Sequence, residues 1–145
     1  MAGDDVIVVG AVDDIIIPFV LAAAATYDAT QRVYLTYTLT NSSGTVYAGR
    51  TSGFGDPHAI MIERFSSHHM KSLGYGNPRL DVFINGIAGY PAIRGREQQL
   101  IDAYGGVGSP QVGNTIRGVA YYNPAGRIYY ASSLIFGKIA EYNGF

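Results

Sequence analysis

The fold of this chain is decided by residues 33–51, which read VYLTYTLT (33–40), NSSG (41–44) and TVYAGRT (45–51). Two runs rich in Val, Thr and Tyr, residue types that favour strands, flank a turn of Asn, Ser and Gly. Gly44 can take the positive φ that tight hairpin turns require. The stretch therefore predicts a β-hairpin that carries Tyr37 on its first strand and Tyr47 on its second.

Composition bounds the class of protein. With 145 residues, 48% of them hydrophobic, the chain suits one domain with a core of its own. The absence of cysteine excludes a disulfide framework and thiolate chemistry. Residues 1–31 hold five aspartates and no Lys or Arg, so the remaining 114 residues carry ten basic and six acidic side chains, a formal charge of +4 (10 − 6). If this excess is clustered, it permits contact with phosphates.

Residues 1–31 are predicted to form a separate apolar and acidic segment. Its eleven-residue apolar run, Ile15 to Ala25, is shorter than the roughly 20 residues that a membrane span requires. No basic stretch precedes this run, so a cleavable signal peptide is not expected. We expect a helix beginning near Pro18 that packs on the domain, or a linker to a longer parent chain. The main domain is then residues 32–145.

A helix is predicted directly after the hairpin. Asp56 can cap the helix N-terminus, and Pro57 suits the first helical position because its missing N–H is not needed there. The helix is expected to run to Lys71. On it, Arg64 and His68 are four residues apart and would share one face.

The rest of the chain predicts one more strand and two more helices. Alternating apolar residues indicate a strand from Arg79 to Ile87, and residues 92–104 and 124–142 have helical patterns. The expected fold is an α/β (α+β) domain, in which a small central antiparallel sheet of about three strands is flanked by helices.

The order of the polar residues resembles the GIY-YIG nuclease family. Residues 35–37, Leu-Thr-Tyr, stand where the family has Gly-Ile-Tyr, and residues 47–49, Tyr-Ala-Gly, stand where it has Tyr-Ile-Gly. The family's helix arginine, the residue one turn on, its metal-binding glutamate and its closing asparagine are matched by Arg64, His68, Glu97 and Asn114. The resemblance covers residues 33–117. Leu35 departs from the family glycine, which leaves Tyr34 as a competitor of Tyr37 for the first tyrosine.

The resemblance implies a metal-dependent endonuclease that hydrolyses phosphodiester bonds, with DNA favoured over RNA. The site is expected on the sheet face between the hairpin and the two helices. Glu97 would hold Mg²⁺ (or Mn²⁺), and Arg64 would bind the scissile phosphate. Tyr37, assisted by Tyr47 or His68, would activate the attacking water, and Asn114 would fix the geometry. Further substrate contacts are expected from Gly49, Arg50, Lys71, Arg94 and Arg96.

The unsignalled apolar N-terminus also resembles that of toxic C-terminal domains of bacterial polymorphic toxins. Such a domain would be made in the bacterial cytoplasm, act in the cytoplasm of a target bacterium and be blocked by an immunity protein, without a stable membrane span. One alternative is a noncatalytic nucleic-acid- or protein-binding module on the same fold, which the Leu35 departure favours. A second alternative is a membrane-active toxin domain that uses residues 6–25.

Overall fold

The computed structural model describes residues 8–9, 11–12, 15–16 and 30–145. Three long antiparallel strands with helices packed around them confirm the predicted α+β class. The helix expected from near Pro18 lies outside the described residues. In the part of the chain that is described, no helix has the length and apolar character needed to cross a membrane.

The predicted hairpin is confirmed. Strands β4 (Val33–Thr40) and β5 (Val46–Gly53) pair antiparallel over their full length. At the turn, the N–H of Gly44 donates to the carbonyl of Asn41 at 3.0 Å, and Gly44 has a φ of 81°. A side chain is strained at that φ, so the turn depends on glycine.

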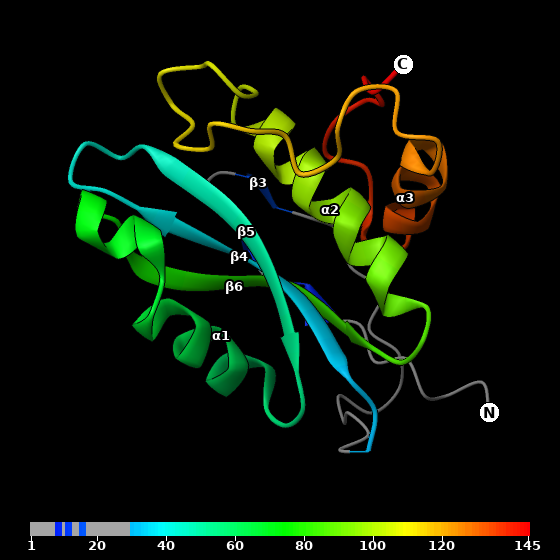
Figure 1. The fold of residues 1–145 in the computed structure, drawn as a ribbon, viewed down its shortest axis with the longest axis horizontal. Helices are drawn as coiled ribbons and strands as arrows, with labels where there is room; N and C mark the ends of the chain where they lie inside the picture. Colours follow the sequence, from blue (N-terminus) through cyan, green and yellow to red (C-terminus); the bar gives the residue numbers. More distant parts are fainter. Residues whose placement is uncertain (1–7, 10, 13–14, 17–29) are drawn as a thin grey trace.

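The third strand, β6 (Gly76–Asn85), pairs with the other side of β4 and begins three residues earlier than predicted. The short β1 (Val8–Val9) lies beside β6, which gives the order β1-β6-β4-β5. Strand β5 is therefore an edge of this sheet, and Figure 1 views the molecule with β5 in front. A separate two-stranded sheet is formed by β2 (Ala11–Val12) and β3 (Ile15–Ile16).

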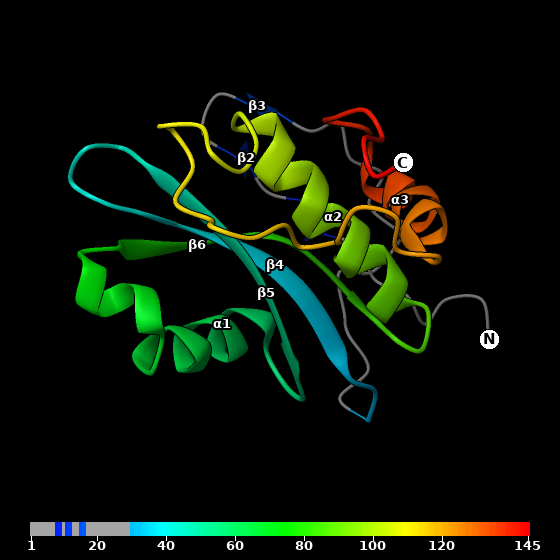
Figure 2. The same ribbon diagram turned by 45° about the horizontal axis from the view of Figure 1, so that its top comes forward.

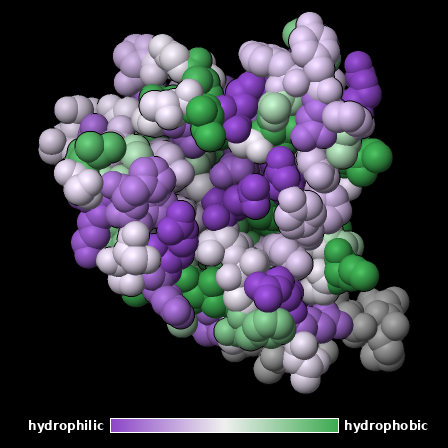
Figure 3. Space-filling model, viewed as in Figure 1, coloured by the Kyte–Doolittle hydropathy of each residue, from purple (hydrophilic) through white to green (hydrophobic). Residues whose placement is uncertain are grey.

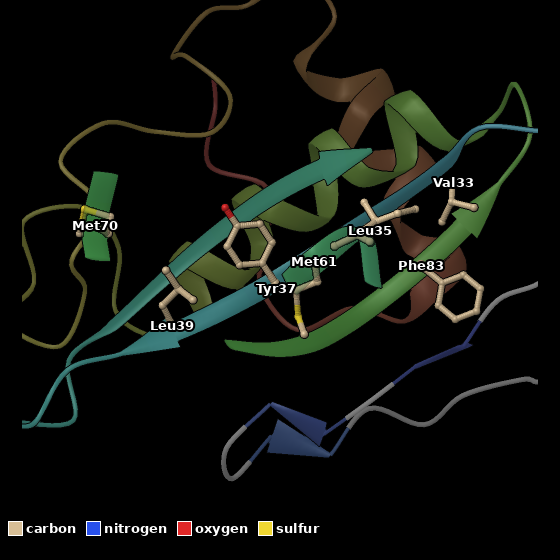
Figure 4. Packing of buried hydrophobic residues seen from close by; sticks show 8 residues of the cluster. Val33, Leu35, Tyr37, Leu39, Met61, Met70 and Phe83 are labelled. Atoms are coloured by element: carbon tan, nitrogen blue, oxygen red, sulfur yellow. The ribbon is translucent and has the colours of Figure 1, made fainter. Parts of the chain in front are cut away.

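Two helices cover opposite faces of the sheet. Helix α1 (Pro57–Ser66) lies on one face and α2 (Gly89–Ala103) on the other, as Figures 1 and 2 show. Successive strand residues point to opposite faces. The odd-numbered residues of β4 therefore pack on the α1 side: Val33, Leu35, Tyr37 and Leu39. Figure 4 shows them along the strand, together with Met61, Met70 and Phe83 from other elements.

The first predicted helix begins as expected but ends at Ser66, before the predicted end at Lys71. Asp56 Oδ2 accepts the N–H of Ala59 at 2.9 Å, as a helix cap should. The helix ends at Ser66, and a separate 3-10 helix, η1 (His69–Leu73), follows. The break occurs because His68 takes an extended backbone and caps η1 with its own ring. The prediction that Arg64 and His68 share a helix face is wrong.

The predicted C-terminal helix is also shorter than expected. Helix α3 (Gly126–Ser133) and the 3-10 turn η2 (Leu134–Phe136) account for its first part. Beyond them the backbone N–H groups of Ile139 and Ala140 donate to Gln99 Oε1, at 2.9 and 3.1 Å, instead of making helical bonds. The tail is thus hydrogen-bonded to α2 through the side chain of Gln99, which lies 40 residues before Ile139.

A buried ion pair joins α2 to the sheet. Thr36 pairs with Val82 and Tyr37 pairs with Leu80, so Asp81 is the extra residue of a β-bulge in β6. Its carboxylate accepts bonds from Arg96 Nε at 2.8 Å and Nη2 at 3.0 Å, and from the Thr36 hydroxyl at 2.7 Å. The Arg96 and Asp81 side chains are 0% and 1% exposed.

We predict that Arg96→Met lowers the free energy of unfolding by about 3–5 kcal/mol, because it leaves the Asp81 charge buried without a partner. The double variant Asp81→Leu/Arg96→Met should recover most of the loss, since it removes both charges. Urea unfolding measures both. Lys138→Met, which breaks an exposed pair with Glu141, is the control and should have little effect on the free energy of unfolding. A loss for Arg96→Met no larger than for this control would contradict the role assigned to the pair.

Candidate active site

Tyr37 lies at the centre of the candidate site. It is 1% exposed and stands directly opposite Gly49 on β5. A β-carbon added at Gly49 would come within 2.6 Å of the Tyr37 hydroxyl, so glycine is what lets the phenol lie across β5. Burial, reinforced by Tyr47 and Glu97 and opposed by Arg64, raises the pKa of Tyr37. The phenol is therefore protonated at neutral pH.

His68 holds the Tyr37 hydroxyl, and its own proton can be assigned. Its Nδ1 accepts the N–H of Met70 at 3.1 Å, so in the neutral ring the proton is on Nε2. Nε2 lies 2.7 Å from the Tyr37 hydroxyl oxygen, to which it must donate. Burial, with the charges of Arg64 and His69, lowers the pKa of His68 to about 4. His68 is thus a neutral donor at pH 7 and cannot take the Tyr37 proton.

Tyr47 and Arg64 complete the α1 side of the site. The Tyr47 ring meets the His68 ring edge to face, with centroids 5.1 Å apart. Arg64 lies half-buried on α1, and its charge opposes the rise in the pKa of both tyrosines. Arg64 also lines a hollow of about 440 Å³ over the open end of β5, together with Thr51 and Gly53. A phosphate in this hollow would meet the guanidinium directly.

Glu97 approaches from α2, on the other side of β5. Its Oε1 accepts a bond from Arg50 Nε at 3.0 Å, and a β-carbon at Gly118 would lie 2.6 Å from the same oxygen. Burial raises the pKa of Glu97, while Arg50 and then Arg94 oppose the rise. The Glu97 charge in turn raises the pKa of Tyr47 and of Tyr37. The two sides of the site therefore interact around the edge strand, and not on one sheet face as predicted.

Asn114 fixes β5 from outside the sheet. Its side-chain amide donates to the Ala48 carbonyl at 2.8 Å and accepts the Ala48 N–H at 3.0 Å. Next to it, Val46 bonds the loop before Asn114 through Gln111 and Gly113. Asn114 thus holds the backbone of β5 at Ala48. The loop at residues 111–114 therefore occupies the outward-facing backbone groups of β5 at Val46 and Ala48, and those of the following residues stay accessible.

The five expected substrate contacts differ in where they lie. Gly49 and Arg50 lie in the site, and Arg94 lies behind it, where it bonds the Tyr90 hydroxyl at 2.7 Å. Lys71 is exposed on η1 and lies over the Phe65 ring. Arg96 is wholly buried against Asp81, so the prediction that it contacts substrate is wrong.

The two candidates for the first tyrosine are on opposite faces. Tyr37 joins His68 on the α1 side, whereas Tyr34 packs on the α2 side against Tyr90, with ring centroids 6.3 Å apart. The structure therefore brings Tyr37 to His68, whereas Tyr34 lies beside Arg50 on the α2 side. Tyr90 and Gly118 were missed by the sequence analysis. The Tyr90–Arg94 spacing of four on a helix was a usable signal, but nothing in the sequence marks Gly118.

The donor set suits one kind of metal ion. Among the described residues, no group of three His, Cys, Asp or Glu side chains is placed to share an ion. Zinc sites take three or four protein ligands, which this region does not offer. Mg²⁺ keeps several waters and needs only one or two carboxylates beside a substrate phosphate. Glu97 is the carboxylate of the site that could serve such an ion.

We predict that the protein loses stability as pH falls from about 6.5 to about 4. His68 has a folded pKa of about 4 against an ordinary value of 6.5, so in this window the unfolded state binds the extra proton. Urea unfolding at several pH values should show this decline, and His68→Gln should remove part of it. His58→Gln, at an exposed position on α1, is the matched control and should leave it unchanged. Equal slopes in all three proteins would refute the assignment.

We also predict that Gly49→Ala destabilises the fold by about 1–3 kcal/mol, as overpacking does, because its methyl group must displace the Tyr37 phenol. The control is Gly76→Ala on β6, where an added β-carbon meets no atom within 4 Å. It should change the free energy of unfolding by less than about 0.5 kcal/mol. Similar losses for the two variants would show that the Tyr37–Gly49 contact is not tight.

Comparisons with known proteins give no relative for this chain. No family model, no curated protein and no solved structure matches it.

Proposed function

We propose that the protein is a metal-dependent endonuclease that hydrolyses phosphodiester bonds. The observation that carries the proposal is a set of polar contacts at β5: His68 holds the Tyr37 hydroxyl at 2.7 Å, Arg50 holds Glu97 at 3.0 Å, and Arg64 lines an open hollow at the end of the strand. Burial raises the pKa values of Tyr37, Tyr47 and Glu97, and buried groups with perturbed pKa values are typical of active sites. Figure 3 shows hydrophilic side chains gathered in a hollow at the centre of this face of the molecule.

Each residue has a role that its position supports. Arg64 binds the scissile phosphate, because its planar fork matches two phosphate oxygens. Glu97 would hold a Mg²⁺ ion, which when bound would neutralise charge on the phosphoryl group. Tyr37 orients the attacking water through its hydroxyl, whose position is fixed by the hydrogen bond from His68 Nε2.

Tyr47 is the second tyrosine of the proposed site, after Tyr37, which orients the attacking water. Its ring packs edge to face with the ring of His68, and the charges of Glu97, Arg64 and Arg50 act on the pKa of its hydroxyl. Asn114 acts indirectly: it bonds the backbone of Ala48 and so positions the neighbouring Tyr47 and Gly49. DNA is the proposed substrate, and the cationic excess of residues 32–145 is compatible with it.

The biological setting is proposed on the resemblance to toxin domains. In it, the domain cleaves DNA in the cytoplasm of a target bacterium, and an immunity protein protects the producing cell. The Arg64 hollow is the surface that such an inhibitor would need to cover.

The test is cleavage of plasmid DNA by the protein with Mg²⁺ and with EDTA. We expect cleavage with Mg²⁺ only, a loss of about 10²–10³-fold for Arg64→Ala, and about 10²–10⁴-fold for Tyr37→Phe. Glu97→Gln should be inactive at all Mg²⁺ concentrations. Arg127→Ala, which removes the same charge from α3, is the matched control and should keep full activity.

Two outcomes would contradict the proposal. Cleavage by Glu97→Gln equal to that of the unchanged protein would remove the metal site. Binding of DNA or RNA without cleavage of either, under any metal condition, would instead establish the noncatalytic binding module.

A further inference from the structure

A second hollow lies on the α2 side of β5. It has a volume of about 220 Å³ and is lined by Tyr34, Arg50, Thr51, Ser52, Tyr90 and Ile93, and we call it the tyrosine hollow. Thr51 and Ser52 also line the Arg64 hollow on the α1 side. The two hollows therefore meet at the open end of the edge strand, and a chain that crosses β5 there would enter both.

Tyr90 is held rigidly and yet is 42% exposed. Arg94 Nη1 donates to its hydroxyl at 2.7 Å. The rings of Tyr34 and Tyr129 meet it edge to face, with centroids 6.3 and 6.2 Å away. A core tyrosine would be covered, whereas a fixed and partly exposed ring is suited to stacking with a planar group.

Polar groups surround the ring on the side of β5. The Arg50 guanidinium lies 6.0 Å from the Tyr90 centroid, the outer limit for a cation over an aromatic ring. The Ser52 hydroxyl accepts a bond from Arg32 at 3.2 Å, which leaves its own proton to donate. A ligand in this hollow thus meets an aromatic face and hydrogen-bonding groups together.

The backbone of β5 adds further donors and acceptors. Backbone groups of an edge strand point outward at every second residue. Those of Val46 and Ala48 are bonded by the loop at residues 111–114. The next outward-facing residues are Arg50 and Ser52, which line the tyrosine hollow. Their N–H and C=O groups are placed to pair with the edge of a flat heterocycle.

We propose that the tyrosine hollow binds one unpaired nucleobase of the substrate, stacked on Tyr90 and hydrogen-bonded to the edge of β5 at Arg50–Ser52. A base in a continuous duplex cannot offer its face to Tyr90, so the protein selects single-stranded or locally unpaired nucleic acid. The inference rests on the proposed function, which identifies nucleic acid as the ligand and places the scissile phosphate at Arg64.

The test is binding in EDTA, where no cleavage is expected, so that binding and activity are separated. Fluorescence anisotropy compares a labelled single-stranded oligonucleotide with the duplex of the same sequence. We expect tighter binding of the single strand. Tyr90→Ala should weaken single-strand binding by about 5- to 150-fold, the effect of losing one stacked base. Tyr90→Phe should keep most of it, and Tyr90→Leu, which fills the same apolar space without a ring, should not.

The controls keep the inference falsifiable. Tyr121→Ala removes another exposed tyrosine outside the hollow and should not change binding. Single abasic sites moved along the oligonucleotide should reveal one position that weakens binding to the unchanged protein but not to Tyr90→Leu. Equal binding of duplex and single strand, or no effect of Tyr90→Leu, overturns the inference even if DNA is cleaved. Conversely, Tyr90-dependent single-strand binding without cleavage would uphold the hollow and refute the nuclease.

Discussion

The buried pair of Asp81 and Arg96 fixes how α2 lies on the sheet, and the position of Glu97 depends on it. Arg96 is bound through two nitrogens to a carboxylate that a β-bulge presents to α2, so the helix has little freedom to rotate or slide. Glu97 is the next residue, about 100° further round the helix at 3.6 residues per turn. That rotation brings its carboxylate to Arg50 at the edge strand. A shift of α2 would move the carboxylate away from Arg50.

On the α1 face of the sheet, a chain of hydrogen bonds from Met70 through His68 to Tyr37 sets which group donates and which accepts. The Met70 N–H fixes the tautomer of His68, and His68 fixes which lone pair of the Tyr37 hydroxyl is occupied. The phenol must then direct its own proton away from His68. His68 therefore orients the Tyr37 hydroxyl and does not act as a base at neutral pH, because its lowered pKa and its tautomer both prevent it from accepting a proton there.

The sequence predicted best what is determined locally. The hairpin turn at Gly44 and the helix start at Asp56 follow from the chemistry of neighbouring residues, and both are confirmed. The end of α1, the bulge at Asp81 and the strapped C-terminal tail depend on partners far away in the chain, and helical periodicity gave no sign of them. The same limit explains Arg96, which looks like a surface cation in the sequence because its partner is 15 residues earlier on another element.

Adjacent residues of α2 thus form two ion pairs of opposite character. The Arg96–Asp81 pair is dry, and removing either partner leaves a charge that nothing solvates, so the pair cannot be exchanged for another ligand. In the Glu97–Arg50 pair, 36% of the arginine side chain but only 11% of the glutamate side chain is exposed. An incoming phosphate can therefore reach Arg50 from solvent, whereas Glu97 is buried and needs a cation beside it whenever Arg50 moves away. The fold is therefore held by one pair, while the neighbouring pair keeps Glu97 and Arg50 in place and available for ligands.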